Sequence, residues 1–216
     1  MNYFYIDTSS SYLYAGIVKE NKILSEIKQN FGKDLSKYTI SEIEKLFKHA
    51  NLMPKDIDKI IVVSGPGSFT GIRIGMTFAK VFAWSMNKEI TTISSLEAMQ
   101  ASVSSKKIIV PIIDARRECV YAGIYKDGKK IYKDQYINFS DLVNYLDKLD
   151  EDYSFVTNDN KFNFENTIKY NPDILKIVLT YKNNNEINPH LVEPNYLKLT
   201  EAEESKKVEE NLVIEK

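Results

Sequence analysis

Residues 60–75 read IIVVSGPGSFTGIRIG and predict a strand, a tight turn and the start of a helix. The four β-branched residues at its beginning are typical of a strand that is buried on both faces. Glycine and proline at residues 65–67 end that strand, because glycine permits positive φ and proline cannot donate to a ladder. Ser68 or Thr70 can then cap a helix that we expect to end near residue 86.

The glycines of this stretch allow two interpretations. A P-loop requires a Gly-Lys-Ser/Thr ending, which is missing here, and a dinucleotide fingerprint requires GxGxxG, whereas Gly65, Gly67 and Gly71 are spaced GxGxxxG. They either form a weak phosphate cradle or make a tight turn that lets the helix and the strand pack closely, and Arg73 either assists an anion or pairs with a neighbour. The spacing favours close packing.

Composition excludes several classes of protein. The 216 residues carry a net charge of −1 and are 43% hydrophobic, which suits a sizeable core and gives no basic face for nucleic acid. A lone cysteine, Cys119, excludes an internal disulfide and a cysteine-based zinc site. No basic-then-apolar leader and no long uncharged apolar run occur, so we expect a cytoplasmic protein without a membrane contact.

A repeat divides the chain. Asp7 is followed seven residues later by Tyr-Ala-Gly-Ile, and Asp114 is followed at the same spacing by the same four residues, at an offset of 114 − 7 = 107. We therefore predict two duplicated lobes, residues 1–104 and 105–198, each opening with a three-stranded antiparallel meander, followed by a charged tail, residues 199–216.

This duplication resembles the α/β fold of the actin-like ATPase superfamily (ASKHA, ribonuclease H-like), whose members bind nucleotide between two lobes. In that superfamily glycine-rich turns clasp phosphate, but neither turn after Asp7 or Asp114 contains glycine here, so we expect no cofactor and doubtful ATP binding. Each aspartate either is a relic of that site or caps its own turn. The weak candidates for nucleotide or anion binding are Asp7, Thr8, Ser68, Thr70, Arg73 and Asp114.

Two helices have unusual apolar faces. Residues 34–51 place Ile40, Ile43 and Phe47 on one face, and the helix after residue 68 is apolar over most of its circumference. Such a helix is either enclosed or shared between a core and a partner. Trp84 lies on its narrow polar line, where it either anchors an interface or packs under a loop. Further helices are expected at about 94–103, 140–149 and 162–170, and strands at 90–93 and 154–157.

As a whole, Gly65–Gly75 closely resembles the signature of the TsaB family, also called YeaZ. Ile112–Arg116 with Glu118, Val120 and Tyr121 resembles its Ile-Asp-Ala-Arg and Glu-Val-Tyr motifs, and Glu193–Lys198 resembles its closing Glu-Pro-x-Tyr-Leu-Arg/Lys motif. The resemblance covers roughly residues 3–198. It departs in three places: Leu35 stands where many members have histidine, a second-lobe helix is expected to be shortened to residues 181–190, and the tail is acidic.

The resemblance implies a non-catalytic scaffold in the synthesis of threonylcarbamoyladenosine beside the anticodon of tRNA. It also implies that TsaD is the catalytic partner and that the ATPase TsaE joins a ternary assembly. The isolated chain is then expected to form a homodimer and to contact tRNA only through the complex. In the family, the first two helices pack against those of the partner. The interface residues expected on this basis are Ile40, Ile43, Phe47, Phe69, Ile72, Met76, Lys80 and Trp84.

Two enzymatic functions are alternatives to the scaffold. A small-molecule kinase or ATPase of the actin-like superfamily would require nucleotide affinity in the isolated chain. A peptidase would require a nucleophile beside a base, but His49 and His190 are the only histidines and neither belongs to a catalytic or metal-binding motif. The sequence therefore predicts no catalytic residue and no metal site.

Overall fold

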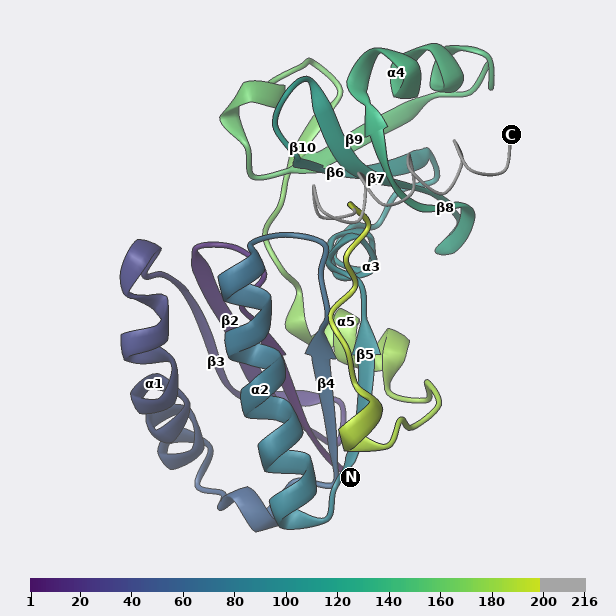
Figure 1. The fold of residues 1–216 in the computed structure, drawn as a ribbon. Helices are drawn as coiled ribbons and strands as arrows, with labels where there is room; N and C mark the ends of the chain where they lie inside the picture. Colours follow the sequence, from purple (N-terminus) through teal and green to yellow (C-terminus); the bar gives the residue numbers. More distant parts are fainter. Residues whose placement is uncertain (199–216) are drawn as a thin grey trace, which may run out of the picture.

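The computed structural model describes residues 1–198, which form two five-stranded mixed sheets, one above the other in Figure 1. In the first sheet the order is β3-β2-β1-β4-β5, and in the second it is β8-β7-β6-β9-β10. The strands are β1 Asn2–Asp7, β2 Tyr12–Lys19, β3 Lys22–Asn30, β4 Lys59–Val63, β5 Glu89–Ile93, β6 Ile108–Asp114, β7 Cys119–Lys126, β8 Lys129–Asn138, β9 Tyr153–Thr157 and β10 Thr167–Lys169.

Five α-helices and four short 3-10 helices cover these sheets within residues 1–198. The α-helices are α1 Leu35–Ala50, α2 Phe69–Met86, α3 Ser95–Ala101, α4 Phe139–Asp147 and α5 Ile174–Tyr181. The 3-10 helices are η1 Gly32–Asp34, η2 Pro54–Asp56, η3 Asn160–Phe162 and η4 Pro189–Leu191. Among these residues no helix combines the length and the apolar character that crossing a membrane requires.

The predicted duplication is confirmed by topology. In each lobe three consecutive strands pair antiparallel, a fourth strand pairs in parallel with the first one, and a fifth pairs in parallel with the fourth. The matched residues are nevertheless out of step by one position, because Asp7 pairs with Tyr14 whereas Asp114 pairs with Val120. A shift of one residue in a strand reverses which face a side chain occupies. The aspartates are the residues that change face, because Ala15 and Ala122, which follow the two tyrosines, both face the main core of their own lobe.

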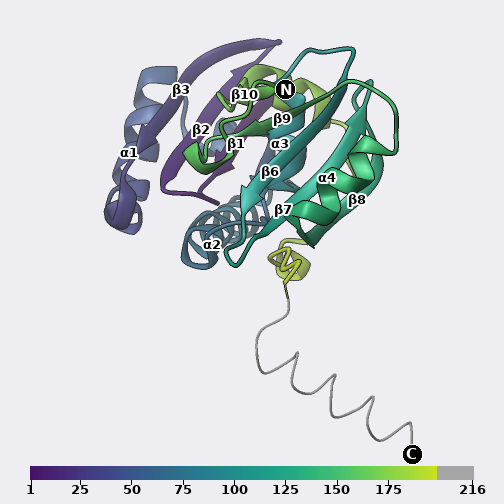
Figure 2. The same ribbon diagram turned by 90° about the horizontal axis from the view of Figure 1, so that it is seen from above.

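The first sheet is buried on both faces, which explains its nearly continuous apolar strands. Phe4 and Ile6 of β1 face α1 and α2, whereas Tyr5 between them faces α3 and α5. The strand β4 alternates in the same way, so both sides of the predicted 60–63 strand lie in a core. Figure 2, seen from above, shows α1 and α2 on the same side of the first sheet.

The end of the chain differs from the prediction. Residues 162–170, expected to be helical, contain the end of η3 and the short strand β10. The shortened helix expected at 181–190 is also wrong, because α5 ends at Tyr181 and most of the following residues are irregular. Burial of Ile174, Ile177 and Val178 holds α5 against the first sheet, although we expected the second lobe to extend to residue 198.

The remaining segment also belongs to the first lobe by its contacts. The backbone of Ile187 donates to Ile90, and that of Asn195 donates to Ser64. In Figure 1 this yellow segment runs along α2 on the side away from α1. The domain boundaries stay a prediction, and the charged tail, residues 199–216, lies outside the described residues.

Candidate functional site

The signature glycines bring α2 against the turn that follows β1. A Cβ atom on Gly67 would lie 2.2 Å from the carbonyl oxygen of Ser9, and one on Gly71 would lie 2.1 Å from that of Thr8. The Thr8 hydroxyl completes the contact, donating to the Gly71 carbonyl at 2.7 Å and accepting from the Gly75 amide at 2.9 Å. The glycines therefore serve close packing, the interpretation that their spacing favours.

The start of α2 is fixed by its own residues. The Ser68 hydroxyl accepts from the Gly71 amide at 3.2 Å and is the N-cap. On the exposed side the Arg73 guanidinium lies 3.7 Å from the centre of the Phe69 ring, and its Nε donates to the Tyr196 hydroxyl at 2.9 Å. Arg73 is thus held by aromatic rings and does not face the turn of Asp7.

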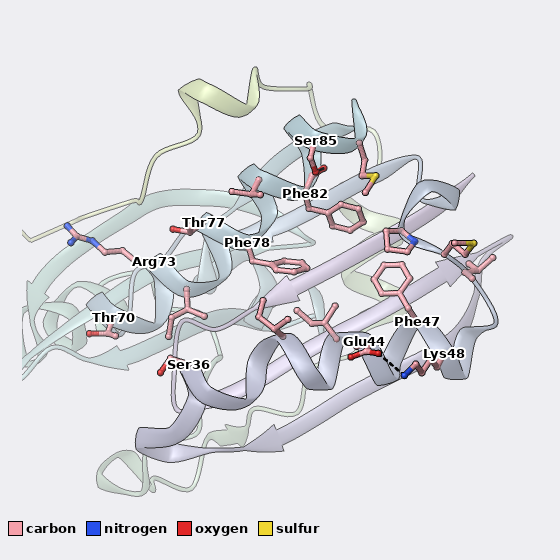
Figure 3. Close-up of a pocket in the computed structure, with 18 of the residues that line it drawn as sticks. Ser36, Glu44, Phe47, Lys48, Thr70, Arg73, Thr77, Phe78, Phe82 and Ser85 are labelled. Atoms are coloured by element: carbon pink, nitrogen blue, oxygen red, sulfur yellow. Dashed lines mark hydrogen bonds and ion pairs between the residues drawn. The ribbon is translucent and has the colours of Figure 1, made fainter.

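An apolar groove separates α1 from α2 and has a volume of about 1080 Å³. Figure 3 shows Phe47 of α1 and Phe78 and Phe82 of α2 turned toward it. Glu44 and Lys48, an ion pair at 2.7 Å, lie at its α1 side. The other residues that line it are Ser36, Ile40, Ile43, Leu52, Met53, Pro54, Phe69, Thr70, Arg73, Ile74, Thr77, Val81, Ser85 and Met86.

Several large side chains of this groove are exposed to an unusual degree. Ile40 on α1 is 59% exposed, and Phe69 and Val81 on α2 are 51% and 56% exposed. Contiguous exposed apolar surface of this kind is typical of protein interaction sites. Ile40, Ile43, Phe47 and Phe69, all expected at an interface, line one continuous surface.

The other expected interface residues do not lie on that surface. Ile72 and Met76 are 1% and 2% exposed, because they face the sheet, so placing them at an interface requires correction. Lys80 donates to the Val192 carbonyl at 2.8 Å on another flank of α2. Trp84 lies on that flank too, 64% exposed, with its ring centre 6.1 Å from that of His190.

The groove residues that the interface prediction omitted include Ile74, Phe78 and Val81, which form an apolar stripe on α2 beside the stripe of Ile72 and Met76. Their helical spacing is visible in the sequence, but two apolar stripes on one helix look alike. Burial decides between them: the stripe of Ile72 and Met76 covers the first sheet and leaves the other stripe toward α1.

The candidates for anion binding are scattered. Asp7 and Asp114 line a cleft between the lobes, where Lys161 pairs with Asp114 at 3.0 Å. Ser68 and Thr70 line a different hollow beside η1, which Asp114 also borders, and the Thr8 hydroxyl is bonded to α2. The structure therefore does not gather these residues into one phosphate site.

Residues 1–198 contain no cluster of three or more histidine, cysteine, aspartate or glutamate residues arranged to hold a metal ion. His49 lies in the last turn of α1, and His190 lies against Trp84 on the far flank of α2. The two histidines, for which the sequence predicts no catalytic role, therefore lie on separate surfaces.

Comparison with known proteins identifies this architecture. The family model described as "TsaD: tRNA N6-adenosine threonylcarbamoyltransferase" matches residues 22–187. The Bacillus subtilis protein named tRNA threonylcarbamoyladenosine biosynthesis protein TsaB is 31% identical, covering 92% of this chain and 94% of its own length. A Buchnera aphidicola protein of the same name is 26% identical over 88% of this chain and 92% of its own.

Solved structures agree in fold. A Pseudomonas aeruginosa protein described as similar to peptidase YeaZ superposes with a TM-score of 0.78 at 17% identity, covering 91% of this chain and 99% of its own. The duplicated sheets and these neighbours define an actin-like α/β protein, which confirms the predicted fold class. Within that class, the chain belongs to the TsaB (YeaZ) family.

Proposed function

We propose that this protein is the non-catalytic subunit of a complex that transfers threonylcarbamoyl to tRNA, and that it holds a TsaD-type transferase through the groove between α1 and α2. A role in tRNA threonylcarbamoyladenosine biosynthesis follows from the family and from the names of the relatives. The scaffold role is carried by one observation: a groove of about 1080 Å³, lined mainly by apolar side chains, that nothing in residues 1–198 covers.

The chemistry of the groove suits a pair of amphipathic helices. Its floor is aromatic, with Phe47, Phe78 and Phe82 between the helices, and exposed aliphatic groups flank it. Helix-in-groove binding buries such a face against regularly spaced apolar anchors. Two helices from a partner would complete a four-helix arrangement with α1 and α2.

The same groove accounts for the rest of the proposed assembly. Without TsaD, a second copy of this chain covers the groove and gives a homodimer. TsaE joins only the mixed complex, and tRNA contacts the complex through TsaD, because this chain has a net charge of −1. All of these steps take place in the cytoplasm.

Size-exclusion chromatography with light scattering tests the proposal, using this chain alone and mixed with TsaD from the same organism. We expect a one-to-one mixed complex to replace the self-dimer. Val81→Glu and Ile40→Glu place a charge in the groove without touching the core, and we expect each to weaken the mixed complex by about 100-fold or more.

The second lobe supplies a matched control. Ile131 on β8 is 49% exposed, close to the exposure of Val81, so Ile131→Glu changes an exposed apolar residue far from the groove. We expect it to bind TsaD as the unmodified chain does. The proposed function is wrong if the two groove variants bind TsaD as tightly as the unmodified chain does. It is also wrong if the unmodified chain forms no complex with TsaD.

A further inference from the structure

A second, smaller cavity lies between the two lobes. It has a volume of about 310 Å³, at the lower end of the range for small-molecule pockets, roughly 300–1,000 Å³. The ends of β1, β6 and β9 open into it, and so does the start of α3. Ligands of open α/β sheets bind outside the carboxyl ends of strands, so this is where the fold itself favours a ligand.

The charge of this cleft is negative. Asp7, Asp114 and Asp159 line it, and no lysine, arginine or histidine of the described residues does. Lys161 neutralises Asp114 from the rim, at 3.0 Å. Asp7 and Asp159 have no ion-pair partner within residues 1–198, so the cleft repels a phosphate or carboxylate group and attracts a cation.

Asp7 is the most informative of these groups. It is 4% exposed, and its bonds are to Ser9, whose amide donates to Oδ1 at 2.7 Å. Burial raises the pKa of this carboxyl group above its ordinary value. A buried carboxylate normally pairs with a cation, and none is present here among the described residues.

An independent polar group points to a missing partner as well. The Ser95 hydroxyl belongs to a residue of the cleft wall that is 3% exposed, and it has no hydrogen-bond partner among residues 1–198. Such groups are rare in folded proteins, because leaving one unpaired costs about 1–3 kcal/mol. A bound molecule with a polar group would satisfy it.

Aromatic rings complete the wall. Tyr14 and Tyr170 both line the cleft, with their rings 6.0 Å apart and nearly perpendicular. Ring faces attract organic cations, whereas Mg²⁺ prefers a shell of oxygen ligands that residues 1–198 do not assemble. The combination of two unpaired carboxylates, a free hydroxyl and tyrosine rings favours an organic ammonium group over an anion or Mg²⁺.

We propose that the interlobe cleft binds a compact organic ammonium compound, of about the size of an amino acid, whose cationic end pairs with Asp7 and whose polar end reaches Ser95. This site is separate from the groove between α1 and α2, and the proposal does not depend on the scaffold function.

Isothermal titration calorimetry of the full chain tests this proposal with three amine probes: 1,4-diaminobutane, ethanolamine and lysine methyl ester. Sodium chloride of equal ionic strength, MgCl₂ and ATP are titrated in parallel. We expect at least one amine to bind, Asp7→Asn to weaken that binding by roughly tenfold or more, and Ser95→Ala to weaken it less. Asp152→Asn, at an exposed carboxylate far from the cleft, should bind as the unmodified chain does.

Each other outcome overturns the assignment. Binding of ATP or Mg²⁺ in place of the amines contradicts it, and so does amine binding that survives Asp7→Asn. Absence of binding by all three amines at ten-millimolar concentration, to a chain shown by circular dichroism to be folded, also refutes it. Because complex formation with TsaD is measured separately, failure here leaves the scaffold function standing.

Discussion

The two lobes share one sheet topology but are covered differently. In the first lobe the chain forms α1 after the meander and α2 between β4 and β5, so two long helices lie on one face of the sheet. In the second lobe α4 follows the meander, and η3 is the only helix between β9 and β10. One copy of the fold therefore has a pair of helices, and the other has a single short one.

This difference places the proposed docking groove on the first lobe. The helix α4 buries Leu142 and Leu146 and closes the core of the second lobe by itself. The helices α1 and α2 each cover part of the first sheet and leave a groove between them. Duplication alone thus gives two sheets of the same topology, and α2 with its glycine signature gives the first lobe the groove that we propose as the docking surface.

The largest effect is expected at the contact that seats α2. Alanine is the better helix former, so propensity alone predicts that Gly71→Ala gains about 1 kcal/mol. The new Cβ would lie 2.1 Å from the Thr8 carbonyl oxygen, so we expect a loss of about 3 kcal/mol or more in the free energy of unfolding. Urea denaturation followed by circular dichroism gives this value.

Gly32→Asn is the control for that substitution. Gly32 has φ +54° and no atom within 4 Å of an added Cβ, and asparagine tolerates this backbone region. We expect a change within about 0.5 kcal/mol. A stabilised Gly71→Ala variant would show that α2 can sit on the first lobe without close approach.

The next effect concerns the cluster that joins the lobes. Asp134 on β8 accepts from the Ser94 hydroxyl and, at 3.0 Å, from Tyr125, while Lys130 bridges it to Glu97 at 3.1 Å on each side. Its side chain is 6% exposed. We expect Asp134→Ala to cost about 2–4 kcal/mol, because it leaves the Ser94 and Tyr125 hydroxyls without their acceptor. Asp152→Ala, which breaks an exposed ion pair with Lys107, should cost less than about 1 kcal/mol in the same urea experiment.

Most of the first lobe follows from local sequence, for physical reasons. The helix and strand around the 60–75 stretch are specified by β-branched residues, glycines and the cap at Ser68, all close in sequence. The capping box of Ser94 and Glu97 likewise predicts α3. Local signals of this kind act through neighbouring backbone groups and need no tertiary information.

The parts that could not be predicted depend on distant contacts. The apolar run of Ile174–Tyr181 is a helix because it buries against the first sheet, more than eighty residues away in sequence from most of its partners. Residues 167–169 extend because β9 pairs with them. Packing also decides which apolar stripe of α2 faces the sheet, and it sets the one-residue offset between the two meanders. Neither can be read from the pattern of a single sequence.

Smaller effects are expected at the helix caps, which allow the lobes to be compared directly. Ser68 caps α2 and Asn138 caps α4, each accepting from a backbone amide. Replacing either by alanine should cost about 1 kcal/mol of unfolding free energy. Ser68→Ala should also weaken the TsaD complex, because α2 lines the groove, whereas Asn138→Ala should leave it unchanged in calorimetry. Equal effects of the two variants on binding would contradict the assignment of docking to the first lobe.

The smallest expected effect is a difference in the pH-dependent stability of variants at Asp7 and Asp114, the aspartates near the start of each lobe. Burial raises the pKa of Asp7, so its contribution to stability is full below the unfolded value of about 3.9 and is lost as pH rises through the folded value. Asp7→Asn removes the ionised form and keeps an acceptor for the Ser9 amide. The variant should therefore be more stable than the unmodified chain near pH 7.5, and the difference should shrink toward pH 4.5.

Asp114→Asn is the matched change in the second lobe, and it should behave in the opposite way. Asp114 lies partly exposed beside Lys161, so its loss removes a favourable ion pair of at most about 1 kcal/mol. Urea unfolding of both variants at four pH values measures the contrast. If Asp7→Asn is destabilised near pH 7.5 as Asp114→Asn is, then Asp7 has a cationic partner in solution, and the cleft is neither unpaired nor open to an added ammonium group. A gain in stability for Asp7→Asn alone would instead show that duplication kept two aspartates and left one of them, in the first lobe, without a partner of its own.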